Sequence, residues 1–128
     1  MKNIIFCSVA IAAFAISLSA CRHDPDLTNA PTIHYSTEIQ PLIGGKCGMA
    51  GCHSDSQGNG EHAEPIVTYK EIMDHDYVKQ GDANGSKLYQ AITGRNGAHK
   101  MPPSGSAQLT RNDVLKIFLW IEEGALDN

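Results

Sequence analysis

The sequence has no excess of positive charge and few signs of catalytic machinery. Its 128 residues include 10 lysines and arginines against 14 aspartates and glutamates, which gives a formal net charge of −4 at pH 7. A chain of this charge has no general affinity for nucleic acid or for an anionic membrane surface. The acidic residues are scattered without pairing, and no serine or cysteine stands in a recognisable nucleophile setting, so the sequence does not predict an enzyme.

Sustained alternation of polar and apolar residues is also missing, as are internal repeats and a second domain. Alternation is the pattern of a half-buried strand, so its absence predicts an all-α protein of short helices and long loops. Long apolar runs are confined to residues 1–20, where one lysine precedes an unbroken series of apolar and small residues. This run is too short for a comfortable membrane span and is typical of a secretory signal peptide.

The signal sequence is followed by a cysteine, in "LSAC", residues Leu18 to Cys21. This tetrapeptide resembles the bacterial lipobox, in which the cysteine receives a diacylglycerol and becomes the new N-terminus. We therefore predict that residues 1–20 are a lipoprotein signal peptide and that Cys21 is lipidated. The alternative is an ordinary export signal that ends in these residues by chance. Loss of Lys2 with the signal takes the net charge to −5, so lipid and not charge would hold the protein at the membrane.

Residues 21–32 have the composition of a tether, because they are polar and include two prolines. Arg22 stands directly after Cys21, where an aspartate retains lipoproteins in the inner membrane of enteric bacteria. The arginine favours the outer membrane, and we expect a lipid-anchored protein of the cell envelope that faces the periplasm. Residues 33–128 then form one small domain.

Four segments of this domain predict short helices. Three begin with a capping box, in which a threonine is followed three residues later by an acid or an amide: Thr37 and Gln40, Thr68 and Glu71, Thr110 and Asp113. A fourth helix is predicted at residues 86–93 and ends at Gly94. The last helix has the clearest apolar face: Val114, Leu115, Phe118, Leu119 and Ile121.

One cluster of reactive and metal-binding side chains occurs in "GGKCGMAGCHS", residues 44–54. Cys47 and Cys52 have four residues between them, and His53 follows directly. Two thiols and an imidazole this close can hold a metal ion, form a disulfide in an oxidising compartment, or anchor a haem. The long loops of so small a domain favour a large flat ligand, around which short helices and loops can wrap.

The spacing of the cysteines departs from the usual haem attachment motif, in which two residues separate them and the histidine binds iron. On a helix at about 100° per residue, a separation of five positions places two thiols roughly 140° apart. A regular helix through Cys47 and Cys52 therefore cannot present both thiols to one haem. Gly48 and Gly51 tolerate the dihedral angles that loop out extra residues and bring the thiols together.

The order of motifs resembles the small cytochrome c domains of exported bacterial lipoproteins, akin to the planctomycete-type cytochrome c family and common in Bacteroidota. The segments that carry the resemblance are "EIQPLIGGKCGMAGCHSD", "TYKEIM", "GDANGSKLYQAITG", "MPPSG" and "LTRNDVLKIFLWIEEGALDN". They extend from about Ile33 to the C-terminus. The spacing of four residues between the cysteines, CX4CH, also looks familiar in this family.

The resemblance implies a class I cytochrome c fold wrapped around one covalently bound haem c. A first helix enters the haem motif, and a closing helix, with Trp120 as its aromatic residue, packs across it. Cys47 and Cys52 are implied as the thioether positions, His53 as the proximal ligand and Met101 of the "MPP" loop as the distal one. The implied function is an electron carrier and not an enzyme, with redox proteins of the envelope as donor and acceptor.

Three alternatives stay open from the residues alone. Cys47 and Cys52 could form a structural disulfide. A copper-binding envelope lipoprotein could use Cys47, Cys52 and Met101 with His53 or His99, although its thiols would have to stay reduced after export. A haem enzyme such as a peroxidase would need a vacant sixth position. The two prolines after Met101 restrict its loop and favour its thioether over His99 as the sixth ligand.

Overall fold

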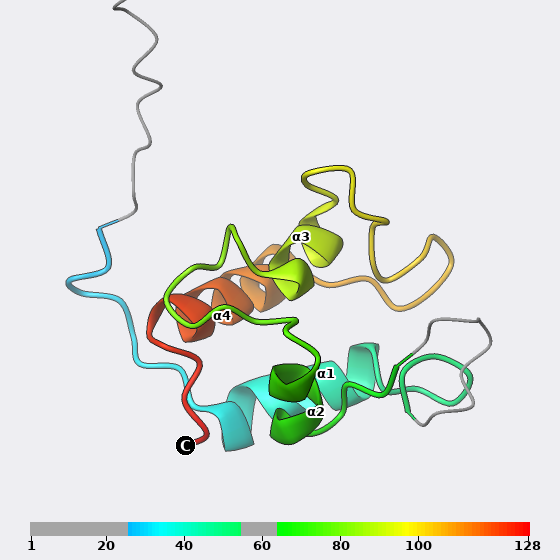
Figure 1. Cartoon of the computed structure of the whole chain (residues 1–128), viewed down its shortest axis with the longest axis horizontal. Coiled ribbons are helices and arrows are strands. Elements are labelled where there is room, and N and C mark those ends of the chain that lie inside the picture. The colour runs from blue at the N-terminus through cyan, green and yellow to red at the C-terminus, as the bar shows by residue number, and fades with distance from the viewer. Residues whose placement is uncertain (1–25, 55–63) are drawn as a thin grey trace, which may run out of the picture.

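The computed structural model describes residues 26–54 and 64–128. The regular secondary structure of these residues is helical, without a β-strand among them. A short π-helix, η1 (Tyr35–Ile39), is followed by α1 (Gln40–Lys46), α2 (Tyr69–Asp74), α3 (Lys87–Thr93) and α4 (Arg111–Glu122) (Figure 1). The prediction of an all-α protein is therefore confirmed for this part of the chain. None of its helices is long and apolar enough to cross a membrane. The predicted signal peptide and Cys21 lie outside the described residues.

Two predicted capping boxes and one predicted helix end are confirmed. The Thr68 and Thr110 hydroxyls accept hydrogen bonds from the N–H groups of Glu71 and Asp113, whose carboxylates accept in return from the threonine N–H groups at 2.8 Å. Each box satisfies two N–H groups that the first helical turn leaves unpaired. Gly94 ends α3 with a φ of 66°, in the left-handed region that glycine adopts without strain.

The predicted capping box at Thr37 and Gln40 is wrong. The chain becomes helical two residues earlier, at Tyr35, and the threonine hydroxyl makes no capping bond. Glu38 takes the capping role instead, because its carboxylate accepts a hydrogen bond from the His34 N–H at 3.2 Å. The first helix nevertheless leads directly into Cys47, as predicted.

The C-terminal segment explains this earlier start. The side-chain oxygen of Asn128 accepts from the Tyr35 N–H at 2.8 Å, and its backbone carbonyl accepts from the Ser36 N–H at 2.9 Å. The Glu123 carboxylate accepts from the Ile33 N–H at 3.0 Å. Residues at the other end of the domain thus supply acceptors that would otherwise have to come from a local cap.

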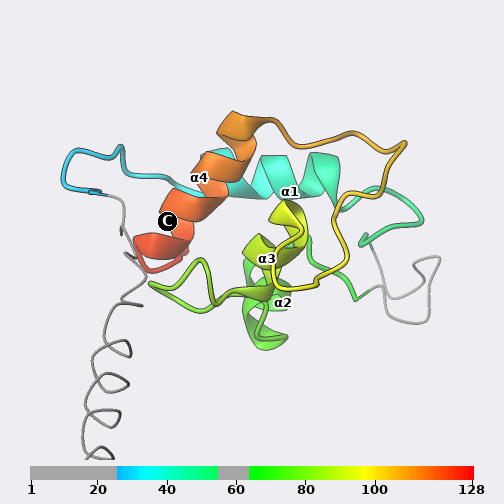
Figure 2. The ribbon, with the colours of Figure 1, turned by 90° about the horizontal axis from the view of Figure 1, so that it is seen from above.

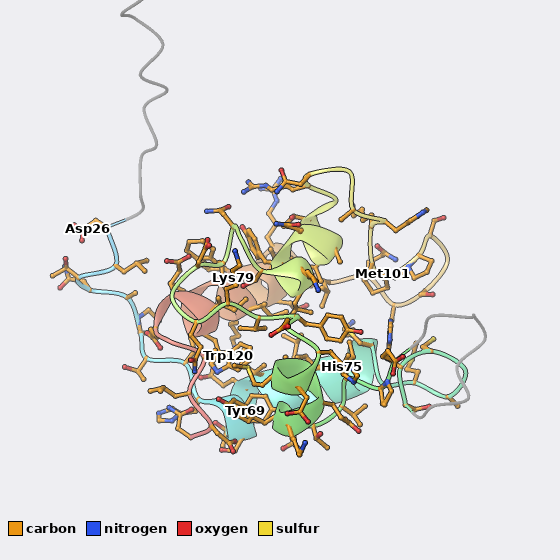
Figure 3. The ribbon with its side chains drawn as sticks, in the orientation of Figure 1. Asp26, Tyr69, His75, Lys79, Met101 and Trp120 are labelled. Carbon is orange, nitrogen blue, oxygen red and sulfur yellow. The ribbon has the colours of Figure 1, made fainter. Side chains whose placement is uncertain are left out.

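The core lies where α4 crosses the first helical segment. Helix α4 packs against η1 and α3, and Figure 2 shows it running obliquely across η1 and α1. Trp120 of α4 is fully buried, with its ring centroid 5.5 Å from that of Tyr35 and 6.5 Å from that of Tyr69 (Figure 3). Its indole N–H donates to the Leu126 carbonyl at 3.0 Å, so the end of the chain is folded back over this cluster.

The apolar face predicted for α4 is only partly correct. Leu119 and Ile121 are buried, whereas Leu115 is 51% exposed. The buried face includes Ile117 and Trp120, which are three positions apart and therefore neighbours on the helix surface. Leu115 lies two positions before Ile117, about 200° around the helix, and points away from the core.

The loops bring distant parts of the sequence to one end of the molecule. Helices α3 and α4 lie on one side in Figure 1, and α1 and α2 lie on the other. The turn that follows α1 and the loop that joins α3 to α4 extend toward the same end in both views (Figures 1 and 2). This end holds the candidate site.

Candidate functional site

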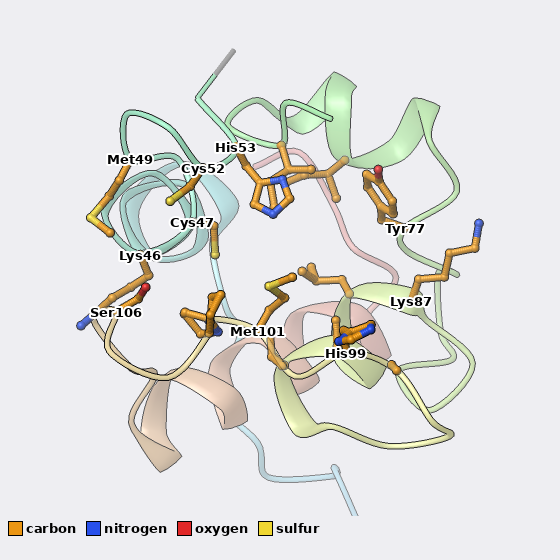
Figure 4. A pocket seen from close by; sticks show the side chains of 18 of the residues that line it. Lys46, Cys47, Met49, Cys52, His53, Tyr77, Lys87, His99, Met101 and Ser106 are labelled. Atoms are coloured by element: carbon orange, nitrogen blue, oxygen red, sulfur yellow. The ribbon is translucent and has the colours of Figure 1, made fainter. Parts of the chain in front are cut away.

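A cavity of about 620 Å³ opens between the end of α1, α3 and the loop that joins α3 to α4. Its volume falls within the range of roughly 300–1,000 Å³ that is usual for cofactor pockets, and most of its wall is apolar. Cys47, Cys52, His53 and Met101 all line it (Figure 4). The structure therefore brings together the four side chains that the sequence analysis singled out as haem or metal ligands.

The turn from Cys47 to His53 places both cysteines in the wall of the cavity, although four residues separate them in the sequence. Helix α1 ends at Lys46, and the Cys47 N–H still donates to the Ile43 carbonyl at 2.8 Å. The chain then leaves the helix, Gly51 adopts a φ of 78°, and the His53 N–H donates to the Cys47 carbonyl at 3.1 Å. The extra residues are looped out as predicted, and His53 returns to a position beside the first cysteine.

Gly48 has a different role from Gly51 in this turn. A Cβ atom at Gly48 would lie 2.2 Å from Cγ1 of Val67, far inside the normal contact distance of about 3.5–4.0 Å between carbon atoms. Gly48 is thus needed because the segment before α2 packs closely against it. The explanation by conformational freedom is correct for Gly51, which has a positive φ, and wrong for Gly48.

His53 is held by the segment that precedes α2. Its Nδ1 lies 2.8 Å from the Glu64 carbonyl oxygen, and its own carbonyl accepts from the Ile66 N–H at 3.2 Å. A ring N–H that donates to a backbone carbonyl is the usual way in which proteins orient a metal-binding histidine. Figure 4 shows the imidazole directed from one wall of the cavity toward its centre.

Cys47 is buried, Cys52 is half-buried, and both are free thiols. Burial raises the pKa of the Cys47 thiol to about 11, and the neighbouring Cys52 adds to this rise, so the thiol keeps its proton at neutral pH. The structure forms no disulfide between them. Within the described ranges, no three side chains of His, Cys, Asp or Glu converge as ligands of one metal ion.

Met101 lies on the opposite wall from His53, and the two side chains point toward each other (Figure 4). Its N–H donates to the Ala91 carbonyl of α3 at 2.9 Å. The segment that follows Met101 is held by the Gln108 side-chain amide. This amide donates, at 2.9 to 3.3 Å, to the carbonyls of three residues of the segment: Pro102, Pro103 and Ser106. The loop that presents the thioether is therefore fixed on both sides.

His99 also lines the cavity, although its side chain is exposed. In Figure 4 it lies beside α3, toward Lys87, and not across the cavity from His53. Of the two side chains weighed as a sixth ligand, Met101 is the one that faces the imidazole.

Two polar residues of the cavity, Tyr77 and Lys87, were not predicted. They lie at the end of the cavity opposite Cys47 and Cys52 (Figure 4). Burial raises the pKa of Tyr77, and the negative charge of Glu64 adds to the rise. Tyr77 follows α2 and Lys87 begins α3. In a sequence such positions indicate only where a helix ends or begins, so no local pattern could have predicted that these residues line the cavity.

Comparison of the chain with protein-family models, curated proteins and solved structures finds no match.

Proposed function

We propose that this protein is a monohaem c-type cytochrome with a cytochrome c-like fold, which carries single electrons in the cell envelope. The observation that carries the proposal is the placement of four side chains around one apolar cavity. His53 and Met101 lie on opposite walls, and the two cysteines lie together on another side (Figure 4). A flat porphyrin would fit this placement, because His53 and Met101 could bind its iron from opposite sides while both thiols reached it from a third side. A single copper ion requires convergent donors instead.

Cys47 and Cys52 would attach the haem covalently. Each thiol would add its S–H across one vinyl C=C bond, and this addition would form one C–S bond and one C–H bond without any gain or loss of electrons. The turn that loops out the residues between the cysteines allows both thiols to reach the same edge of the group.

His53 would bind the iron through Nε2 and Met101 would bind it through its sulfur. A haem bound here supplies a one-electron couple between ferrous and ferric iron. The hydrogen bond of His53 to the Glu64 carbonyl keeps the imidazole in orientation, and the apolar wall keeps water away. A thioether raises the reduction potential relative to a second imidazole. With His53 and Met101 both bound to the iron, the chain would leave no position for a substrate, which favours a carrier over a peroxidase.

Lys87 and Tyr77 would hold the two propionates. The propionates and vinyl groups of a porphyrin extend from opposite edges, and these two residues lie at the end of the cavity opposite the cysteines (Figure 4). An ammonium and a phenol can each donate to a carboxylate, and the charged donor gives the stronger bond. The positive charge of Lys87 would also offset part of the negative charge of the propionates.

We also propose that Cys21 carries a lipid that anchors the protein, through residues 22–32, to the outer membrane facing the periplasm. Its electron donor and acceptor would be redox proteins of the envelope, without any role for nucleic acid. Metabolic labelling with a fatty acid tests the anchor. We expect label on the wild type and none on Cys21→Ala. Absence of label from the wild type, or label retained by the variant, would show that the anchor is wrong.

Haem staining tests the main proposal. The protein is expressed in a host with haem attachment machinery, denatured, and stained in the gel for haem peroxidase activity. We expect the wild type to keep its stain and the double variant Cys47→Ser/Cys52→Ser to lose it, while Cys7→Ser, which alters only the signal sequence, behaves as the wild type. A folded but colourless wild type that binds copper would overturn the proposal in favour of a copper lipoprotein.

A further inference from the structure

The positive charges of the domain fall into two groups. Three of the eight lysines and arginines in the described ranges form ion pairs: Lys70 with Asp74, Lys79 with Asp82, and Lys116 with Glu38. The other five form no ion pair with a described acidic residue, and all line the cavity or a groove beside it: Lys46, Lys87, Arg95, Lys100 and Arg111. No described aspartate or glutamate lines either space. Within the described ranges of this chain of net negative charge, the cations without an ion pair therefore all lie around these two spaces.

The groove adjoins the cavity across the loop that carries Met101. It has a volume of about 360 Å³, and Met101 and Pro102 line both spaces. Other apolar side chains line the groove: Ile92, Leu109 and Val114. Three cations line it as well: Arg95, Lys100 and Arg111. The groove therefore combines apolar contact surface with positive charge.

The Arg95 side chain is held by neutral partners, and none of the three cations of the groove forms an ion pair with a described acidic residue. The Arg95 guanidinium donates to the Asn84 side-chain oxygen at 2.9 Å and lies 5.6 Å from the centroid of the Tyr89 ring. Asp113 is the acidic residue nearest in sequence to Arg111, but its carboxylate accepts from the Thr110 N–H, and Asp113 does not line the groove. The cations are thus available to an external carboxylate.

We propose that this groove docks an acidic segment of a partner protein, whose apolar side chains cover the groove and whose carboxylates meet the three cations. Arg95 and Lys100 lie in the loop that joins α3 to α4, and Arg111 begins α4. A polypeptide with both apolar side chains and carboxylates matches this lining better than a small anion, which would use only the charges. Only the description of the partner as a redox protein rests on the proposed haem function; the docking itself does not.

A labelled peptide of alternating glutamate and leucine is the probe, and the mature protein purified in neutral detergent is the target. Fluorescence anisotropy measures its affinity for the wild type, for Lys100→Gln/Arg111→Gln, and for Lys70→Gln/Lys79→Gln. The two double variants lose the same charge, but the second loses it from paired residues outside the groove. We expect salt-sensitive binding that weakens about tenfold in the first variant, the size expected for two exposed charge contacts, and less than about twofold in the second.

Equal weakening in both double variants would overturn the proposal, because general charge attraction would then explain the binding. Absence of binding to the wild type would overturn it as well. Inorganic phosphate that competes fully with the peptide would make the groove a small-anion site, and a wild-type dimer dispersed by the groove variant would make the occupant a second copy. Haem staining of each sample separates this test from the test of the haem proposal. Peptide binding to a haem-free protein would support the docking groove and would contradict the description of the partner as a redox protein.

Discussion

The imidazole Nδ1 of His53 lies 2.8 Å from the backbone carbonyl oxygen of Glu64. A carbonyl oxygen can only accept a hydrogen bond, so in the neutral imidazole Nδ1 carries the proton and Nε2 keeps the lone pair. The acceptor belongs to the segment just before α2, whereas His53 follows α1. The packing of these two segments therefore decides which ring nitrogen keeps its lone pair.

This hydrogen bond predicts a slow exchange of the His53 Nδ1 proton with solvent. The reduced protein, labelled with ¹⁵N-histidine, should show a His53 ring N–H that persists in D2O. The rings of His34, His75 and His99 belong to exposed residues and should exchange rapidly. Long-range ¹H–¹⁵N NMR spectra recorded after transfer to D2O make the measurement. Rapid exchange of every histidine ring proton would mean that the bond to Glu64 does not persist in solution.

Met101 is expected to be the sixth ligand, because it faces His53 across the cavity while exposed His99 lies beside α3. Ferric protein should then show the weak far-red absorption band of sulfur bound to iron. The variant Met101→Ala should lose this band, have a lower reduction potential and bind added imidazole. The matched variant His99→Ala should leave all three properties nearly unchanged. Optical titration and potentiometry of the three proteins make the comparison.

The reverse pattern in these two variants would assign the sixth position to His99. Ready binding of imidazole or cyanide by the wild type would show a vacant or displaceable position instead. That result would revive the reading of the protein as a haem enzyme.

The helices with strong local signals could be predicted from the sequence. The boxes at Thr68 and Thr110 form within four residues of chain, so neighbouring residues alone decide them. The start of the first helix could not be predicted, because Tyr35 and Ser36 take their acceptors from Asn128 at the other end of the domain. A tertiary contact of this kind leaves no local pattern.

The candidate site likewise has some residues whose placement could be predicted from the sequence and others whose placement depends on tertiary contacts. Cys47 and His53 come from one compact motif, so their common placement follows from the sequence. The approach of Met101 depends on its N–H bonding to the Ala91 carbonyl, and the position of Lys87 depends on how α3 packs. The need for space at Gly48 is visible only because Val67, from another segment, packs against it.

The close contact of Gly48 with Val67 predicts opposite effects of alanine at two neighbouring glycines. Gly48→Ala should lower the free energy of unfolding by about 1–3 kcal/mol, because the added methyl group has no space. Gly45→Ala should raise it by about 0.5–1 kcal/mol, since Gly45 lies inside α1 with nothing within 4 Å of its added Cβ. Urea denaturation measures both. Adding Val67→Ala to Gly48→Ala should recover part of the loss, and a failure to do so would place the strain elsewhere.

The hydroxyls of Tyr35 and Tyr69 predict a second contrast. Tyr35 is 3% exposed and its hydroxyl has no hydrogen-bond partner among the described residues, whereas the Tyr69 hydroxyl donates to the Ala125 carbonyl at 2.9 Å. Tyr35→Phe removes an unpaired buried group and should leave the unfolding free energy at pH 8 unchanged or higher. Tyr69→Phe should lower it by about 1 kcal/mol. A loss in Tyr35→Phe as large as in Tyr69→Phe would mean that the Tyr35 hydroxyl has a partner in solution.

The same tyrosine predicts a change in stability at alkaline pH. Burial raises the pKa of Tyr35 to about 12, and the negative charges of Asp127 and Glu71 add to the rise. In the unfolded chain its pKa is about 10, so between pH 10 and pH 12 the unfolded state releases this proton while the folded state retains it. Proton release favours the unfolded state, so this residue should cost the wild type up to about 1.4 kcal/mol of stability for each pH unit in that interval. The variant Tyr35→Phe lacks the titrating group, and its advantage over the wild type should therefore widen from pH 8 to pH 11 in urea denaturation followed by circular dichroism. A difference between the two proteins that stays constant over this range would show that Tyr35 titrates alike in the folded and unfolded states.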